Sequence, residues 1–249
     1  MDLQLADKVA IVTGASRGLG LAITRAFVAE GMRVVAAARS EAELTALAAE
    51  FPGRVHPFVV DMTDTARLPD LVGAATDTYG RLDVLVNNAG VAPAGAFVDT
   101  DLDVWRRTFE VNVFAPVVLT RAAGDVLVGQ GHGKVINVGS LSSLRGKPVL
   151  TAYTSSKGAL VRFTEALAGE WAKRNVQVNM IAPGGFATEA QRAVLDAPEV
   201  LSRRVRKIPA GRMGEADEIG PLACYLASPL SDFVTGASYV IDGGELAKL

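Results

Sequence analysis

The sequence has few of the residues that build disulfides and metal sites. Among its 249 residues it contains one cysteine, Cys224, and two histidines, His56 and His132. A single cysteine excludes an intramolecular disulfide and is typical of a reducing compartment. Cys224 lies in an apolar helical run, so we expect it to be a buried small hydrophobe. The histidines are isolated and no cluster has metal-ligand spacing, so we expect no metal site.

Charge imbalance, targeting signals and linkers are also lacking. The formal net charge is -2, which does not indicate a nucleic-acid or anionic-membrane surface. No signal pattern precedes the first predicted strand, and we find no uninterrupted apolar run long enough to span a bilayer. We therefore expect a cytoplasmic protein without nucleic-acid or membrane partners. No Pro- or Ser-rich linker, repeat or low-complexity tract divides the chain, so residues 1–249 are expected to form one domain.

The sequence instead alternates strand and helix patterns along its whole length. Apolar, β-branched runs predict strands within residues 9–13, 31–39, 55–60, 84–86, 134–138, 176–181 and 238–241. Amphipathic runs predict helices at residues 19–30, 64–79, 102–128, 151–173 and 215–226. This alternation is typical of an α/β fold with one doubly wound parallel sheet of about seven strands, covered by helices on both faces.

A glycine-rich turn connects the first predicted strand to the first predicted helix. It reads Thr13-Gly14-Ala15-Ser16-Arg17-Gly18-Leu19-Gly20. The backbone N–H groups and the positive helix end at such a turn can hold a pyrophosphate. Gly14 would permit the tight turn, Gly18 the approach of phosphates, and Gly20 close packing of the helix. The spacing departs from the commoner G-x-G-x-x-G pattern, and an ordinary strand-to-helix turn is the alternative.

Two arginines indicate which dinucleotide this turn would hold. The second strand ends in Ala38-Arg39-Ser40, without an acidic residue before Glu41. A free ribose 2′-hydroxyl usually meets an acidic residue there, whereas a 2′-phosphate needs a cation. Arg17 supplies a second guanidinium near the same ribose, so we expect NADP(H) rather than NAD. Each arginine taken alone could also be a solvated surface residue.

Polar residues and glycines end the other predicted strands. Ligands bind beyond the carboxyl ends of the strands in such sheets, so these residues are candidates for the path of the cofactor. Asp61 could accept hydrogen bonds from an adenine amino group, or could face a helix N-terminus. The fourth strand ends in Asn87-Asn88-Ala89-Gly90, the fifth in Ser140, and Pro183-Gly184 follows the sixth.

The candidate chemistry lies at Ser140, Tyr153 and Lys157. Tyr153 and Lys157 are four residues apart on a predicted helix, so their side chains share one face. An ammonium beside a phenol favours the phenolate, so we expect Lys157 to lower the pKa of Tyr153 and make it a general acid or base. Ser140 could hydrogen-bond the substrate oxygen. A tyrosine and a lysine also meet at this spacing by chance, and the pair gains weight from lying downstream of the dinucleotide turn.

These motifs resemble those of the classical short-chain dehydrogenase/reductase family over essentially the full chain. The residues that carry the resemblance are Thr13-Gly14-x-x-x-Gly18-x-Gly20, Asp61, Asn87-Asn88-Ala89-Gly90, Val111-Asn112-Val113, Ser140, Tyr153-x-x-x-Lys157, Pro183-Gly184-x-x-x-Thr188 and Asp242-Gly243-Gly244. The resemblance implies a Rossmann-type domain in which the tyrosine is the acid/base, the serine orients the carbonyl and the lysine also binds the nicotinamide ribose. It further implies that Asn112 holds a water linking Lys157 to solvent, and that Thr188 contacts the nicotinamide amide.

The reaction implied by the resemblance is hydride transfer between nicotinamide C4 and a carbonyl carbon, with Tyr153 protonating the oxygen in reduction. The implied catalytic residues are Asn112, Ser140, Tyr153 and Lys157. The implied cofactor-binding residues are Gly14, Ser16, Arg17, Gly18, Leu19, Gly20, Arg39, Asp61, Met62, Asn88, Ala89, Gly90, Tyr153, Lys157, Pro183, Gly184, Phe186 and Thr188.

Two segments are expected to form the substrate pocket, a loop at residues 141–150 and a lid at residues 185–213. Arg145 and Lys147 in the loop could attract a carboxylate-bearing substrate, although solvated loop cations are the ordinary alternative. A basic cluster in the lid is expected to be the wet face of a helix, and consists of Arg203, Arg204, Arg206 and Lys207.

Two subgroups of the family give leads on the substrate. Glu170-Trp171-Ala172 and the segment 183–189 resemble polyol and sugar-acid dehydrogenases of the gluconate 5-dehydrogenase type, which implies a small polar carbonyl. The alternative is a 3-oxoacyl-(acyl-carrier-protein) reductase. That subgroup carries a cation before the His-Gly of the fifth strand and another before the sixth, where this chain has Gly131 and Arg174, so half of the docking surface is missing. A non-catalytic dinucleotide-binding regulator is a third reading. It usually lacks the tyrosine, lysine or serine, all of which are present here.

An apolar stripe on the helix that carries Tyr153 bears on assembly. Leu160, Phe163, Leu167 and Trp171 recur at three- and four-residue steps, a wider stripe than one sheet contact requires. The resemblance implies that this helix and the one carrying Asn112 pair across a two-fold axis, and that the C-terminal strand makes a second contact. We therefore expect a homotetramer, with packing inside the subunit explaining part of the stripe.

Overall fold

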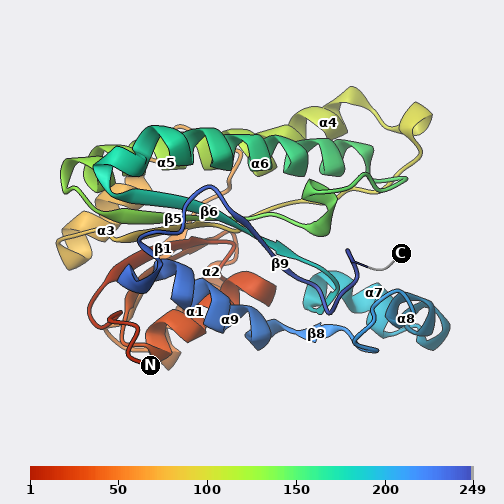
Figure 1. Ribbon diagram of the computed structural model, residues 1–249, viewed down its shortest axis with the longest axis horizontal. Coiled ribbons are helices and arrows are strands. Elements are labelled where there is room, and N and C mark those ends of the chain that lie inside the picture. Colours follow the sequence, from red (N-terminus) through yellow and green to blue (C-terminus); the bar gives the residue numbers. More distant parts are fainter. Residues whose placement is uncertain (248–249) are drawn as a thin grey trace.

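The β-branched runs form a seven-stranded parallel sheet between two layers of helices (Figure 1). This computed structural model describes residues 1–247, and the last two residues of the expected 1–249 domain lie outside the described residues. The strand order is β3-β2-β1-β4-β5-β6-β9. The chain thus runs from β1 to one edge, returns to β4 beside β1, and continues to the other edge. The predicted doubly wound α/β fold is confirmed.

Most elements lie close to where the apolar patterns predicted them. The strands are β1 (Val9–Thr13), β2 (Arg33–Ala38), β3 (Val55–Val59), β4 (Val84–Asn87), β5 (Gly133–Val138), β6 (Val176–Pro183), β7 (Phe186–Ala187), β8 (Gly214–Glu215) and β9 (Ser238–Ile241). The helices are α1 (Gly18–Ala29), α2 (Glu41–Glu50), α3 (Asp70–Tyr79), α4 (Leu102–Phe109), α5 (Ala115–Gly129), α6 (Thr151–Trp171), α7 (Arg192–Leu195), α8 (Pro198–Val205) and α9 (Gly220–Ala227).

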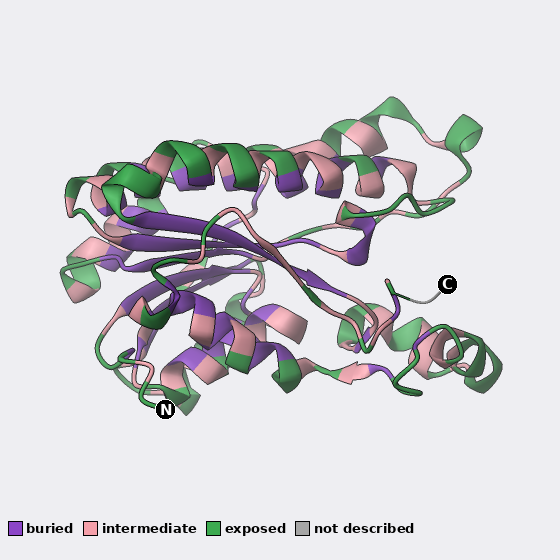
Figure 2. Cartoon of the chain, in the orientation of Figure 1, coloured by how far each residue is buried: buried purple, intermediate pink, exposed green. Residues whose placement is uncertain are grey.

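Alternate residues of each central strand pack against opposite helix layers. On β1, Ala10 and Val12 join the core formed with α1, α2 and α9. Val9 and Ile11 join the core formed with α3, α5 and the end of α6. Both faces of the central strands are therefore buried (Figure 2), which is why these strands are apolar at nearly every position. In the edge strand β3 only Val55 is buried, and the residues after it alternate between half-buried and exposed.

Proline explains most of the differences between predicted and observed helices. Residues 64–69 form turns and α3 begins after Pro69, because proline has no N–H to continue a helix. In the lid segment, the short helices α7 and α8 are separate, since Ala197 between them adopts the extended backbone that residues before proline prefer. The helix expected at 215–226 begins with a 3₁₀ turn at Ala216–Ile219 before α9.

The helix expected at 102–128 contains a feature that hydrophobic periodicity does not reveal. Its α-helical parts, α4 and α5, are joined by a π-helical turn at Glu110–Phe114, which carries Asn112. Such turns occur frequently at functional sites. By length and composition alone, Leu102–Gly129 is long and apolar enough to cross a membrane, although charged residues such as Arg107 and Glu110 interrupt its apolar run. Half of its most apolar window is buried inside the protein, where α5 packs on the sheet.

The apolar stripe of α6 is largely used inside the subunit. Leu160 is buried and packs with Phe163. Leu167 and Trp171 pack against the core beneath α5. The indole of Trp171 lies so close to Gly124 that a Cβ there would be 2.9 Å from the ring. Packing within the subunit therefore accounts for much of the stripe from which we predicted a partner.

An unpredicted two-stranded parallel sheet closes the lid segment at its base. β7 pairs with β8, with Phe186 opposite Gly214 and Ala187 opposite Glu215. A Cβ at Gly214 would lie 2.9 Å from the Phe186 ring, so glycine allows the close approach. The helices α7 and α8 lie between these two strands in the sequence and project beyond the carboxyl end of the main sheet (Figure 1).

Candidate active site

The in-register carboxyl ends of the parallel strands open into a cleft of about 820 Å³. Of the residues predicted from the sequence, Gly20 and Asn112 lie behind the walls of this cleft. All the others line it, namely Gly14, Ser16, Arg17, Gly18, Leu19, Arg39, Asp61, Met62, Asn88, Ala89, Gly90, Ser140, Tyr153, Lys157, Pro183, Gly184, Phe186 and Thr188. The fold therefore brings together in one cleft residues that are distant in the sequence.

The glycine turn is built so closely that larger residues would not fit. Gly14 has a positive φ of 66°, and a Cβ on Gly20 would lie 2.3 Å from the carbonyl oxygen of Gly14. The Asn88 side chain donates to the carbonyl of Thr13 at 2.9 Å, while the Thr13 hydroxyl accepts from the backbone N–H groups of Asn88 and Ala89. The turn is thus fixed to the end of β4. This cradle fits a dinucleotide pyrophosphate at the N-terminus of α1.

Where β2 and β3 end, the carboxylate of Asp61 lies between two arginines. Asp61 Oδ2 lies 3.9 Å from Arg39 and 4.0 Å from Arg107. Its Oδ1 accepts hydrogen bonds from the backbone N–H and the hydroxyl of Thr63, and the first of these is the main cause that lowers the pKa of the Asp61 carboxyl. Asp61 therefore stabilises its own turn and also lines the cleft, whereas the helix N-terminus that we considered as its alternative partner lies further along the chain, since α3 begins at Asp70.

Charge reversal at Arg39 is expected to change the cofactor preference. The side chain is largely exposed at the ribose end of the cleft, so Arg39→Asp should bind a 2′-phosphate poorly without disturbing the core. We expect the ratio of kcat/KM for NADPH to that for NADH to fall by about 100-fold, since a charge-assisted hydrogen bond is replaced by repulsion. Arg162→Asp, on the outer face of α6, is the control and should leave the ratio unchanged. An unaltered ratio in the Arg39 variant would contradict the assignment.

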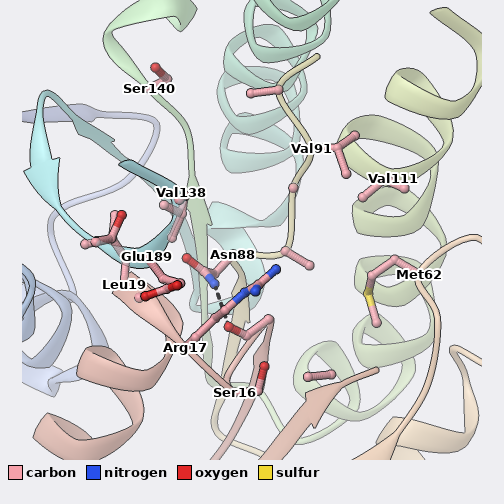
Figure 3. A pocket seen from close by; sticks show the side chains of 18 of the residues that line it. Ser16, Arg17, Leu19, Met62, Asn88, Val91, Val111, Val138, Ser140 and Glu189 are labelled. Atoms are coloured by element: carbon pink, nitrogen blue, oxygen red, sulfur yellow. Dashed lines mark hydrogen bonds between the residues drawn. The ribbon is translucent and has the colours of Figure 1, made fainter. Parts of the chain in front are cut away.

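Three charged residues that were not predicted from the sequence also line the cleft, and one of them is Glu43 from α2. Arg107 comes from α4 and Glu189 from the 3₁₀ turn at the start of the lid. Figure 3 shows Glu189 near Arg17 and Asn88, while Met62 and Val111 lie on the opposite side. No local motif marks Arg107 or Glu189, because their positions depend on how α4 and the lid pack over the sheet.

Ser140 is held in place by a reciprocal hydrogen-bonded cap. Its hydroxyl accepts from the backbone N–H of Ser142 at 3.1 Å, and its own N–H donates to the Ser143 hydroxyl at 3.1 Å. The cap begins the 3₁₀ turn at Leu141–Ser143, directly after β5. The Ser140 side chain is thus fixed at the carboxyl end of a buried strand, beside Tyr153.

Lys157 and Asn112 are buried next to Gly90. The Lys157 ammonium donates to the carbonyl of Val138 at 2.8 Å. The Asn112 amide exchanges hydrogen bonds with both backbone groups of Val91, each at 2.9 Å, and donates to Ser156. The side chain of Asn112 therefore clamps the loop after β4 to α6. The family resemblance implied that Asn112 holds a water molecule. The structure shows that the Asn112 side chain also holds two segments together.

Burial, rather than the lysine, dominates the pKa of the tyrosine. Desolvation raises the pKa of Tyr153, and its hydrogen bond to Ser140 lowers it. The expectation that Lys157 lowers this pKa was wrong for this structure, because the ammonium is directed to the Val138 carbonyl. Burial also lowers the pKa of Lys157 itself, to about 8. A protonated phenol at neutral pH is suited to donate a proton during reduction.

The lowered pKa of Lys157 predicts a pH limit on catalysis. The lysine carries its charge below its pKa of about 8 and loses it as the pH rises through that value. We therefore expect kcat/KM for ketone reduction to fall with increasing pH above about 8. Lys157→Arg should move this decline to higher pH, because a guanidinium stays charged. A pH profile that is flat to pH 10 in the parent enzyme would contradict the prediction.

A cluster of charges lies beside Gly185, the residue after the cleft-lining Gly184. Glu245, near the C-terminus, forms ion pairs with Arg145 at 3.0 Å and with Arg204 at 2.7 Å. The Arg204 side chain is only 20% exposed, so the expectation that the basic cluster of the lid is simply its wet face was wrong for this residue. Its guanidinium packs over Gly185, where an added Cβ would lie 2.6 Å from it.

Comparison with known families and curated proteins identifies relatives of nearly full length. A family model described as enoyl-(acyl carrier protein) reductase matches residues 14–245. The chain is 40% identical over 238 residues to a galactitol 2-dehydrogenase (L-tagatose-forming) of Cereibacter sphaeroides, covering 94% of this chain and 93% of that protein. It is 34% identical over 245 residues to a 3-oxoacyl-(acyl-carrier-protein) reductase of Thermotoga maritima, covering 97% and 99% of the two chains.

A solved structure extends the likeness to the fold and the cofactor. A gluconate 5-dehydrogenase from Burkholderia cenocepacia, in complex with NADP and tartrate, superimposes with a TM-score of 0.94 at 31% identity. The match covers 100% of this chain and 98% of that chain. The relatives therefore include a polyol dehydrogenase, a sugar-acid dehydrogenase and a carrier-protein reductase.

Proposed function

The chain belongs to the short-chain dehydrogenase/reductase family, and from this premise we propose that it interconverts a small polar ketone and its secondary alcohol with NADP(H). It is an oxidoreductase that acts on CH–OH groups. The observation that carries the proposal is the placement of Ser140, Tyr153 and Lys157 in the same cleft as the glycine turn. The nicotinamide, when bound, supplies or accepts the hydride.

Each catalytic side chain has a distinct task in this proposal. Tyr153 donates its phenolic proton to the carbonyl oxygen in reduction and withdraws it from the alcohol in oxidation. Ser140 donates a hydrogen bond to the same oxygen and is preorganised for this by its cap. Lys157 contributes a positive charge at the site, and its ammonium would donate hydrogen bonds to the ribose hydroxyls of the cofactor. Asn112 holds the loop after β4 against α6 through its hydrogen bonds with Val91 and Ser156.

The glycine turn, Arg17 and Arg39 would hold the cofactor at its phosphates. In the proposal, Asp61 and Met62 face the adenine, whereas Pro183, Gly184 and Thr188 face the nicotinamide; all five residues line the cleft. In the proposal, residues 141–150 form the substrate loop and residues 185–213 the lid. The pairing of β7 with β8 supports treating the lid as a single unit.

A sugar-acid or polyol-type carbonyl is the proposed substrate class. Galactitol and gluconate dehydrogenases are among the relatives, and the sequence of residues 183–189 resembles that group. Cations of the substrate loop and of the lid meet at Glu245, and one of them, Arg204, packs over Gly185, the residue after the cleft-lining Gly184; this favours a substrate that carries negative charge.

Reduction of a 3-oxoacyl group on acyl carrier protein is the second candidate, favoured by the curated relative of that name. The carrier-protein reductases have a cation at the position of Gly131, and its absence here argues against this second candidate. Gly131 has a positive φ of 70°, which disfavours a side chain such as arginine, while Arg174 remains exposed. A non-catalytic regulator is disfavoured because the tyrosine, serine and lysine are all present.

We propose that the protein is a cytoplasmic homotetramer. Exposed apolar side chains support a partner subunit near α4 and another near β9. Those near α4 are Phe97, Val98, Leu102 and Phe114, and those near β9 are Leu230, Phe233 and Val240. Light scattering at micromolar concentration tests the assembly, and a monomer mass would overturn it.

Incubation of the purified protein with NADPH and 5-ketogluconate tests the proposed reaction. We expect NADPH oxidation with stoichiometric formation of the corresponding alcohol. The Tyr153→Phe variant should be nearly inactive under the same conditions. Failure to oxidise NADPH with any keto-sugar acid or ketose would overturn the proposed substrate class.

A further inference from the structure

The charge cluster around Glu245 has more cations than its single carboxylate can pair. Arg145 from the substrate loop and Arg204 from α8 both reach this carboxylate, which is only 9% exposed. The charges of Arg204, Lys207 and Arg145 act on Lys147 as like charges, and Glu245 is the one opposing charge among them. Within residues 1–247, the ammonium of Lys147 has no hydrogen bond or ion pair of its own. Such a surplus of positive charge favours binding of an anion.

The environment of Lys147 supports this view. Desolvation is the main cause that lowers its pKa, followed by the charge of Arg204. An anion bound beside this ammonium would relieve both effects, because it supplies a counter-charge where water and protein supply too little. Lys147 as a residue is nevertheless exposed, so a ligand can reach it.

The position of the cluster connects it with the reacting end of the cleft. Lys147 lies in the loop between Ser140 and Tyr153, and Arg204 packs on Gly185, next to the cleft-lining Gly184. The same loop is fixed on its other side, where the carbonyl of Val149 accepts from the N–H of Gly95 at 2.9 Å. Val149 holds a positive φ of 59°, which is rare for a β-branched residue and marks a tightly constrained loop.

We propose that Arg145, Lys147 and Arg204 form the subsite that binds the carboxylate end of the substrate. Glu245 is a positioning residue, since it holds the two arginines from two different segments and leaves Lys147 for the ligand. A bound carboxylate then connects the substrate loop to the lid and selects sugar acids over neutral polyols. This inference rests on the proposed ketone reduction and specifies which member of the polar substrate class is preferred.

A pair of substrates that differ only in charge tests the subsite. L-Sorbose carries a hydroxymethyl group where 5-ketogluconate carries its carboxylate, and both have the same ketone. With NADPH, Lys147→Met should lower kcat/KM for 5-ketogluconate by about tenfold, mainly through KM, since one charge-assisted contact is lost. The value for L-sorbose should stay within about threefold. Lys173→Met, an exposed lysine after α6, is the matched control and should change neither value.

Glu245→Gln provides the second test, because it keeps the shape of the side chain but removes the charge that orients both arginines. We expect a higher KM for 5-ketogluconate and an unchanged KM for L-sorbose. Equal losses on both substrates, or no loss on either, in both variants would overturn the subsite while leaving ketone reduction intact. Parent enzyme that reduces L-sorbose but not 5-ketogluconate would also overturn it. Reduction of neither would overturn the substrate class and the subsite together.

Discussion

Tyr153→Phe is expected to lower kcat for ketone reduction by at least about 100-fold, the usual cost of losing a general acid. The substitution removes one hydroxyl and keeps the ring that packs at the N-terminal end of α6. Because desolvation keeps the phenol protonated at neutral pH, no other described side chain at the site is as well placed to supply the proton. The measurement is the steady-state rate of NADPH oxidation with 5-ketogluconate.

Two controls separate this effect from a general loss of structure. Tyr79→Phe, at the end of α3, lies outside the cleft and should retain the parent rate. The affinity of the Tyr153 variant for NADPH should remain within about threefold of the parent value, since the cofactor contacts are retained. Turnover within a few-fold of the parent would rule out Tyr153 as the acid.

Lys157→Met is expected to reduce kcat by about 100-fold or more, and to weaken NADPH binding as well. Methionine fills a similar volume, but it supplies neither the charge nor the hydrogen bond to the Val138 carbonyl. Lys157 is 4% exposed, so water cannot readily replace the lost ammonium. Rates and cofactor affinity should be measured together with the thermal midpoint.

The comparison with Lys173→Met shows whether the effect belongs to the site. Because Lys173 is exposed and lies after α6, its substitution should leave the rate, the affinity for NADPH and the midpoint of thermal unfolding unchanged. If the Lys157→Met variant unfolds cooperatively on heating and its rate is close to that of the parent, the role assigned to the buried ammonium is contradicted. Partial recovery of the rate in Lys157→Arg would support a requirement for positive charge at this position.

The central part of the fold could be predicted from the sequence because its signals are local. A β-branched run, a glycine turn and an apolar-periodic helix specify β1 and α1, and the strand ends then place Asn88, Ser140 and Pro183 at one edge. Tyr153 and Lys157 were predicted from their helical spacing together with their place downstream of the glycine turn and the family resemblance. Their pKa values were not, because the burial of each group and the Val138 carbonyl that binds the lysine are tertiary features.

Other features depend on packing between distant segments and left no local signal. The π-helical turn at Glu110–Phe114 continues the apolar periodicity of its neighbours, so it cannot be distinguished from α-helix in the sequence. Arg107 lies near Asp61 only because the fold brings α4 to the wall of the cleft. Glu245 pairs with arginines 100 and 41 residues away, which no spacing pattern along the chain would predict.

The most direct test of the account is the ratio of kcat/KM for 5-ketogluconate to that for a 3-oxoacyl thioester, measured with NADPH. The loop and lid cations, together with glycine at position 131, predict a ratio far above one. A ratio far below one would contradict the sugar-acid assignment, restore the carrier-protein reductase and make Arg174 the next residue to substitute.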